Sequence, residues 1–126
     1  FVWLDADVLI LDFKLRIESI CAKTPNAHII MSRDASALAN TGFIIIRNSR
    51  WALQFLKDWL QERNTAGVLN DQMGFESLYY KRPIIEMQSK IAILEPHILN
   101  SILPAMGRQQ KHHKVLHLAA ESDTYR

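Results

Sequence analysis

The chain has 126 residues, of which 48% are hydrophobic and 22% are charged, so it has the composition of one globular domain or part of one. The formal net charge is only +2 at pH 7 and the basic residues are scattered, which gives nucleic-acid binding little support. The single cysteine excludes an intrachain disulfide, and no apolar run is long enough for a membrane span.

The first eleven residues, FVWLDADVLIL, are the most informative stretch. Residues 1–4 are apolar and rich in aromatic and β-branched types, which predicts a buried strand, most often of a parallel sheet. Asp5 and Asp7 follow directly, and both carboxylates point to one side if the chain stays extended. Carboxylates at a buried strand end are costly unless a cation neutralises them, so we expect a divalent metal such as Mg²⁺ or Mn²⁺. The alternative is an ordinary turn or helix cap.

The rest of the chain alternates helical and extended patterns. A helix is expected around residues 14–23, another begins after Asn48 or Ser49 and ends at residues 64–67, and a third begins at residues 70–72 and is stopped by residues 81–83. Short strands are expected at residues 28–31, 43–46, 91–94 and 114–119, with loops at 32–39 and 96–104 and an exposed polar stretch at 107–114.

The second helix carries an apolar face in which Trp51, Phe55 and Trp59 recur at i, i+4 and i+8. This spacing predicts that both tryptophans pack in the core and do not form a binding platform. In the third helix, Phe75, Leu78 and Tyr79 are the residues expected to face inward; they repeat at the same helical period.

Three later motifs could carry chemistry. The tripeptide Asn40-Thr41-Gly42 precedes the most apolar strand, and its glycine would let the backbone approach a ligand closely. Asp71 and Gln72 open the third helix, where an ordinary cap beside an exposed glutamine is the alternative explanation. The last strand carries a histidine that could equally be a packed core residue.

The order of these motifs resembles the metal-dependent, GT-A-fold glycosyltransferases among the nucleotide-diphospho-sugar transferases, nearest the galactosyl-, mannosyl- and xylosyltransferase family. The resemblance implies an α/β, GT-A-like (Rossmann-like) domain with a mixed, mostly parallel sheet and flanking helices. It covers residues 1–126, but as the C-terminal part of a single such domain, truncated at the N-terminus. We therefore expect upstream sequence before Phe1, and expect the chain alone to lack the base and ribose pocket.

The resemblance also implies roles for particular residues. Asp5 and Asp7 match the Asp-x-Asp signature that holds Mn²⁺ (or Mg²⁺) against the donor diphosphate, and His117 matches the late histidine that supplies a third metal ligand. Asp71 and Gln72 match a catalytic acid–amide pair that lines the donor-sugar pocket. The residues expected to touch substrate are Asn40, Thr41, Gly42 and Asn100. One departure is that His117 is followed by Leu-Ala-Ala-Glu instead of the frequent His-x-x-Gly.

The implied activity is transfer of a sugar from a nucleoside-diphosphate sugar to a glycan hydroxyl, with retention at the anomeric carbon. The implied parent is a type II membrane protein of the Golgi lumen, anchored upstream of this chain. Two alternatives stay open. One is a haloacid-dehalogenase-type phosphohydrolase, although Val8-Leu9-Ile10 stands where Gly or Thr is usual and Asp71 has no acidic neighbour. The other is an inactive, truncated copy of a glycosyltransferase.

Overall fold

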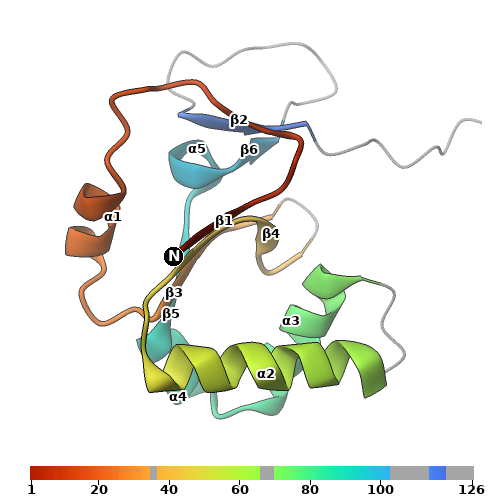
Figure 1. The fold of residues 1–126 in the computed structure, drawn as a ribbon. Helices are drawn as coiled ribbons and strands as arrows, with labels where there is room; N and C mark the ends of the chain where they lie inside the picture. The colour runs from red at the N-terminus through yellow and green to blue at the C-terminus, as the bar shows by residue number, and fades with distance from the viewer. Residues whose placement is uncertain (35–36, 66–69, 103–113, 119–126) are drawn as a thin grey trace, which may run out of the picture.

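The computed structural model describes residues 1–34, 37–65, 70–102 and 114–118. In this part of the chain the strands form two sheets (Figure 1). The larger sheet has the order β1 (Val2–Leu4), β4 (Asn40–Ile46), β3 (Ile29–Ser32), β5 (Ile91–Leu94), and the smaller has the order β2 (Val8–Ile10), β7 (Val115–His117), β6 (Ser101–Ile102). The helices are α1 (Ile17–Lys23), α2 (Arg50–Thr65), α3 (Asp71–Lys81), α4 (Ile84–Lys90) and α5 (Pro96–Leu99).

The pairing of the strands confirms a mixed sheet but not a mostly parallel one. Within the described residues, β4 is antiparallel to both β1 and β3, and β2 is antiparallel to β7. Only β3 with β5 and β6 with β7 run parallel. The reason is connection length, because a short link such as the one between β3 and β4 reverses the chain direction, whereas parallel neighbours need a longer crossover. Helices α2, α3 and α4 follow β4 and supply the longer connection that brings β5 beside β3.

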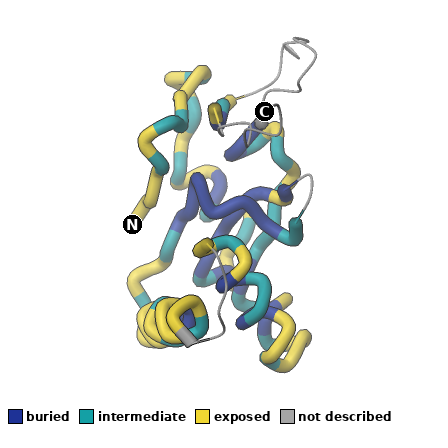
Figure 2. Tube along the Cα trace, turned by 90° about the vertical axis from the view of Figure 1, so that its right-hand side faces the viewer, coloured by how far each residue is buried: buried dark blue, intermediate teal, exposed yellow. Residues whose placement is uncertain are grey.

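The larger sheet separates two apolar clusters, because alternate residues of a strand point to opposite faces. On one face, Ile29, Met31 and Ile44 pack against α2, α3 and α4, whereas Ile30 and Ile45 pack on the other face with residues of α1, α5 and β7. The buried residues gather along the central strands, and the outer side of α2 is exposed (Figure 2). Among the described residues, no helix combines the length and apolar character that crossing a membrane requires.

Most predicted helices are present, with shifted ends. Helix α1 begins at Ile17, three residues later than expected, and α3 begins after Asn70, whose side-chain Oδ1 accepts a hydrogen bond from Met73 N at 2.8 Å. The inward residues expected in α3 and both tryptophans of α2 lie in or against the core cluster, as predicted. The helix end at residues 66–67 and the polar stretch at 107–113 lie outside the described residues.

Two segments differ from the prediction. Helix α4 has no predicted counterpart, and α5 with β6 occupies most of the expected loop at 96–104. Both helices are short and follow a proline or contain one at the first position, where proline serves as a helix start and not as a breaker. Met87 of α4 and Leu99 of α5 are fully buried, so tertiary packing stabilises helices that are too short to form alone.

Strand β1 also differs from the prediction of a buried, parallel strand. It pairs only with β4 among the described strands, at the edge of the larger sheet, and its three residues are exposed. The prediction was wrong because a strand paired on one side leaves apolar side chains such as Trp3, 57% exposed, open to solvent. Strand β4, in turn, begins at Asn40, so Asn40-Thr41-Gly42 is part of the strand and not a turn before it.

His28, just before β3, gives the fold a pH dependence. Its Nδ1 lies 2.6 Å from Ser49 Oγ, and partial burial, with the nearby Lys90 and Arg47 cations, lowers the pKa of His28. The unfolded chain then binds more protons than the folded one at acidic pH. The unfolding free energy therefore falls as the pH drops below about 6.5, the ordinary pKa of histidine, and keeps falling until the pH passes the lowered pKa of His28 in the folded state. We expect His28→Gln to lose less stability than wild type between about pH 7 and pH 5 in urea titrations.

The matched control is His97→Gln, because His97 is exposed. This variant should follow the wild-type curve. If His28→Gln and wild type lose the same unfolding free energy on acidification, the account of His28 is wrong.

Candidate metal centre

The two aspartates lie in a turn that joins β1 to β2. Asp5 N donates to Gly42 O of β4 at 2.9 Å, and Val8 N donates back to Asp5 O at 3.2 Å. Asp7 O accepts from Leu118 N at 3.0 Å, so the turn is tied to both sheets. The chain is not extended here, because the backbone closes a tight turn through these bonds instead of continuing the strand, as the alternative of an ordinary turn has it.

His117 is brought to the turn by the pairing of β7 with β2, in which it stands opposite Val8. Its Nε2 lies 3.1 Å from Asp7 Oδ1 and 3.9 Å from Asp5 Oδ2. One ligand atom from each of the three side chains lies within 4.8 Å of the others. The structure therefore brings together residues that are more than a hundred positions apart in the sequence.

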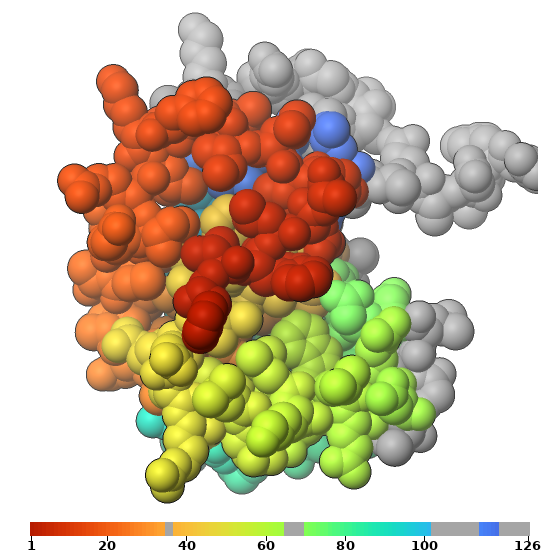
Figure 3. Space-filling model, in the orientation of Figure 1, coloured from red at the N-terminus to blue at the C-terminus, as the bar shows by residue number. Residues whose placement is uncertain are grey.

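The three side chains differ in exposure. The His117 side chain is 8% exposed, whereas those of Asp5 and Asp7 are 37% and 44% exposed. The imidazole therefore lies on the buried side of the cluster, and the carboxylates face solvent. Trp3 Nε1 donates to Asp5 Oδ1 at 2.9 Å, which leaves Oδ2 of that carboxylate facing the histidine. Figure 3 shows the N-terminal residues, in red, on the surface of the molecule close to the blue residues of the C-terminal strand.

The cluster fits a divalent cation. One oxygen from each of two carboxylates and one imidazole nitrogen come together, and this mixed oxygen and nitrogen set suits Mn²⁺ and is compatible with Mg²⁺. Gly42 makes the room for the ring, since a Cβ built on it would lie 2.3 Å from His117 Cε1 and 2.6 Å from Nδ1. Real Cβ atoms do not approach other atoms so closely, so this position accepts only glycine while the ring stays in place.

Of the residues expected to touch substrate, Asn40 faces the histidine ring, and Gly42 and Asn100 both donate to the Asn40 side chain. Asn40 and Thr41 are 5% exposed and Asn100 is fully buried. Asn40 Oδ1 lies 3.2 Å from His117 Nδ1 and also accepts a hydrogen bond from Asn100 Nδ2. Asp34, to which Asn40 donates at 2.8 Å, was not singled out in the sequence, where it is one polar residue in an expected loop.

Asp71 and Gln72 lie elsewhere, in the first turn of α3. Asp71 is exposed and borders an apolar groove of about 300 Å³ whose walls include Trp59 and Trp3. Trp3 is also the residue that donates to Asp5, so the groove and the metal cluster share one side chain. Among the described contacts, none joins Asp71 or Gln72 directly to Asp5, Asp7 or His117.

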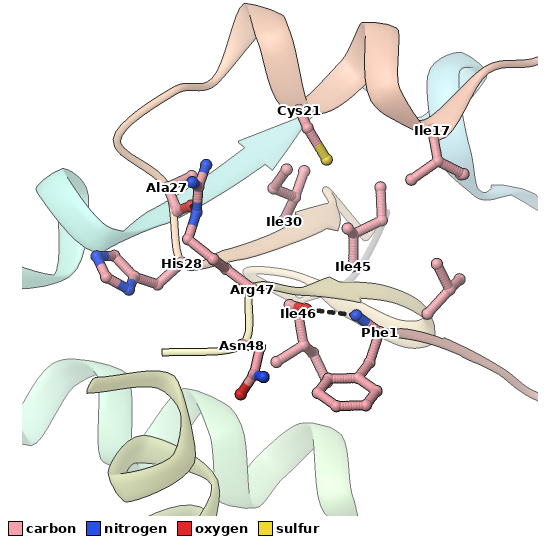
Figure 4. A pocket seen from close by; sticks show the side chains of 11 residues that line it. Phe1, Ile17, Cys21, Ala27, His28, Ile30, Ile45, Ile46, Arg47 and Asn48 are labelled. Atoms are coloured by element: carbon pink, nitrogen blue, oxygen red, sulfur yellow. Dashed lines mark hydrogen bonds between the residues drawn. The ribbon is translucent and has the colours of Figure 1, made fainter. Parts of the chain in front are cut away.

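A second cavity of about 300 Å³ lies between α1 and the larger sheet (Figure 4). Its walls are mostly apolar and include Phe1, Ile17 and Cys21, and the Phe1 amino group donates to Ile46 O at 2.7 Å. None of the three cluster residues lines this cavity. It lies on the other face of the larger sheet from the groove, because Ile30 and Ile45 line it whereas Ile44 lines the groove.

The fold is a mixed α/β domain whose acidic turn and buried histidine form a candidate metal centre. The chain matches the family model of the nucleotide-diphospho-sugar transferases over residues 1–124. It therefore belongs to the nucleotide-diphospho-sugar transferase family, which indicates a glycosyltransferase-type activity with a nucleotide-sugar donor. No curated protein and no solved structure matches the chain. The phosphohydrolase and inactive-copy alternatives gain no support from the family match.

Proposed function

We propose that this chain is the metal-binding part of a glycosyltransferase in which Asp5, Asp7 and His117 hold one Mn²⁺ or Mg²⁺ ion. The observation that carries the proposal is the approach of His117 Nε2 to within 3.1 Å of Asp7 Oδ1 and 3.9 Å of Asp5 Oδ2. Two carboxylates and an imidazole whose ligand atoms lie within 4.8 Å of one another are a set that one divalent cation can bridge. A nucleotide-sugar transferase needs positive charge beside the diphosphate of its donor.

When bound, the cation would neutralise charge that develops on the nucleoside diphosphate as the glycosidic bond breaks. The chain's own side chains form the site that would bind this cation. His117 is held on the buried side, and the half-exposed carboxylates of Asp5 and Asp7 face solvent, from which a diphosphate can approach. Trp3 fixes one oxygen of Asp5 through its indole N–H and leaves the other oxygen for coordination.

The donor sugar is proposed to lie beside Asp71 and Gln72, with Thr41 and Gly42 near the metal side. Support comes from the groove that Trp3 and Asp71 both line, because Trp3 also donates a hydrogen bond to Asp5 of the metal cluster. A carboxylate beside the anomeric carbon would stabilise oxocarbenium character, as carboxylates do in glycoside hydrolysis. Transfer of a hexose or pentose to a glycan hydroxyl with retention, in the Golgi lumen and with an upstream membrane anchor, completes the proposal and rests on the family resemblance.

Asp71→Asn tests whether the groove acts on the donor sugar separately from metal binding at Asp5, Asp7 and His117. We expect donor hydrolysis to fall at least about a hundredfold, the lower range for losing one positioned charged group, with Mn²⁺ affinity within about twofold of wild type. Nucleoside diphosphate release and Mn²⁺ titration measure the two quantities. Asp58→Asn is the control, since Asp58 pairs with Arg82 within the helical layer. A collapse of Mn²⁺ affinity in Asp71→Asn would place Asp71 in the metal centre instead.

The proposed activity itself is tested by a screen of nucleoside-diphosphate sugars. Hydrolysis of one donor is expected with Mn²⁺ and not with a chelator, and nucleoside diphosphate is the product. Mn²⁺ binding without turnover of any donor would favour the inactive-copy alternative. Turnover of an aryl phosphate in place of a sugar nucleotide would favour the phosphohydrolase.

A further inference from the structure

The buried hydrogen bonds behind the metal centre fix the orientation of the Asn40 side-chain amide. Gly42 N donates to Asn40 Oδ1 at 2.8 Å, and Asn40 Nδ2 donates to Asp34 Oδ2 at 2.8 Å. A backbone N–H can only donate, and a carboxylate oxygen accepts. The oxygen of the Asn40 amide must therefore point toward Gly42 and its nitrogen toward Asp34, which removes the usual ambiguity of amide orientation.

The same oxygen faces the ring of the proposed metal ligand. Asn40 Oδ1 lies 3.2 Å from His117 Nδ1, on the opposite side of the ring from Asp5 and Asp7. Because an amide oxygen offers only electron pairs, a hydrogen bond here requires that Nδ1 carry the proton. In the neutral ring, Nε2 is then left with a free electron pair, and Nε2 is the atom that faces the two carboxylates.

We propose that Asn40 is a positioning residue for His117, which selects the tautomer with the proton on Nδ1 and so reserves Nε2 for the cation. The proposal rests on the proposed metal centre. It gives Asn40 a role different from direct contact with the donor sugar. The side chain is 5% exposed and both its amide oxygen and its amide nitrogen have protein partners, so it acts through the histidine.

The competing tautomer conflicts with metal binding and with Asn40. Its Nε2 proton could donate to Asp7 only while no cation is bound, because the proton occupies the coordinating position. Its Nδ1 would set an electron pair against the oxygen of Asn40 in a buried site. Asn40 cannot turn away to relieve this, because its oxygen also accepts from Gly42 N and Asn100 Nδ2. The network therefore fixes the ring before any metal arrives, as outer partners of metal-bound histidines do.

The direct test reads the two ring nitrogens of His117 by ¹⁵N NMR in the metal-free protein at about pH 8, where an ordinary imidazole is mostly neutral. The His117→Gln spectrum assigns the signals. We expect a protonated Nδ1 and an unprotonated Nε2 in wild type, and loss of this preference in Asn40→Ala. Mn²⁺ affinity, from the signal of free Mn²⁺ in electron paramagnetic resonance, should fall about 10–100-fold in Asn40→Ala.

Two further variants separate positioning from packing. Asn100→Ala removes another buried partner of the Asn40 oxygen but leaves that oxygen facing Nδ1, so we expect the wild-type tautomer and near-wild-type Mn²⁺ affinity. The exchange Asp34→Asn with Asn40→Asp keeps an oxygen in front of Nδ1 and an amide–carboxylate hydrogen bond beside it. It should restore both the tautomer and the affinity that Asn40→Ala loses.

The outcomes distinguish this inference from the proposed function. A proton on Nε2 in wild type, or an Asn40→Ala protein with unchanged tautomer and unchanged Mn²⁺ affinity, would overturn the role of Asn40. Equal losses in Asn40→Ala and Asn100→Ala would also overturn it, because packing alone would then be the cause. If wild type shows the expected tautomer but binds no Mn²⁺, the role of Asn40 at the ring stands and the proposed metal centre fails.

Discussion

Asp7→Ala is expected to abolish Mn²⁺ binding at the turn between β1 and β2. Asp7 Oδ1 is the carboxylate oxygen nearest to His117 Nε2, at 3.1 Å, so its loss leaves two ligands where three converge. Removing an outer partner of a metal ligand costs about 10–100-fold in affinity, and removing a ligand itself should cost at least the upper end of that range, about 100-fold or more. Metal-dependent hydrolysis of the donor should be lost with it.

The fold should not change, because the Asp7 side chain is 44% exposed and its contact is with His117, while its backbone oxygen still accepts from Leu118 N in the variant. We expect the unfolding free energy to stay within about 0.5 kcal/mol of wild type. Asp12→Ala is the matched control, since Asp12 follows β2 at its other end and accepts a hydrogen bond from Lys14 N. Unchanged Mn²⁺ affinity in Asp7→Ala, measured by isothermal titration, would remove the metal assignment.

Gly42→Ala is expected to damage both the fold and the metal site. The added Cβ would lie 2.3 Å from His117 Cε1 and 3.0 Å from Asn40 Oδ1, and the ring is held between the Asn40 oxygen and the acidic turn. Overpacking of this kind costs about 1–3 kcal/mol of stability. Because the strain is relieved only by moving the ring, we expect Mn²⁺ affinity to fall by at least about tenfold, as when a ligand's orientation is lost.

Gly74→Ala is the matched control for this variant. A Cβ there would meet Arg63 Cβ at 3.2 Å and Trp59 Nε1 at 3.4 Å, which is tight, but Gly74 lies inside α3, where alanine favours the helix by about 0.5–1 kcal/mol. Urea unfolding and Mn²⁺ titration of both variants separate a loss of stability from a loss of binding. If Gly42→Ala binds Mn²⁺ as tightly as wild type, metal binding does not depend on the present position of the His117 ring.

The secondary structure could be predicted where the apolar pattern is long and regular. The face of Trp51, Phe55 and Trp59 indicates α2, and Asn70 begins α3, because periodicity and capping act within one segment. Strand direction could not be predicted in this way. It depends on which neighbours a strand finds, and β1 finds β4 in the antiparallel sense on one side only among the described strands.

For the metal cluster, the sequence alone indicates two of the three residues. Asp5 and Asp7 stand out in the sequence, since paired acids between apolar runs need a partner. His117 is linked to them in the sequence only by resemblance, because its approach depends on the register of β7 against β2. The roles of Asp34 and Asn40 behind the ring could not be inferred at all. A buried amide network is defined by contacts among residues 34, 40, 42 and 100, and no local pattern records them.

The most direct test of this account is the anomalous scattering of Mn²⁺ in crystals of the wild-type protein. We expect one strong peak at coordinating distance from a carboxylate oxygen of Asp5, a carboxylate oxygen of Asp7 and Nε2 of His117. A peak bound by other residues, or none at this site under saturating Mn²⁺, would contradict it.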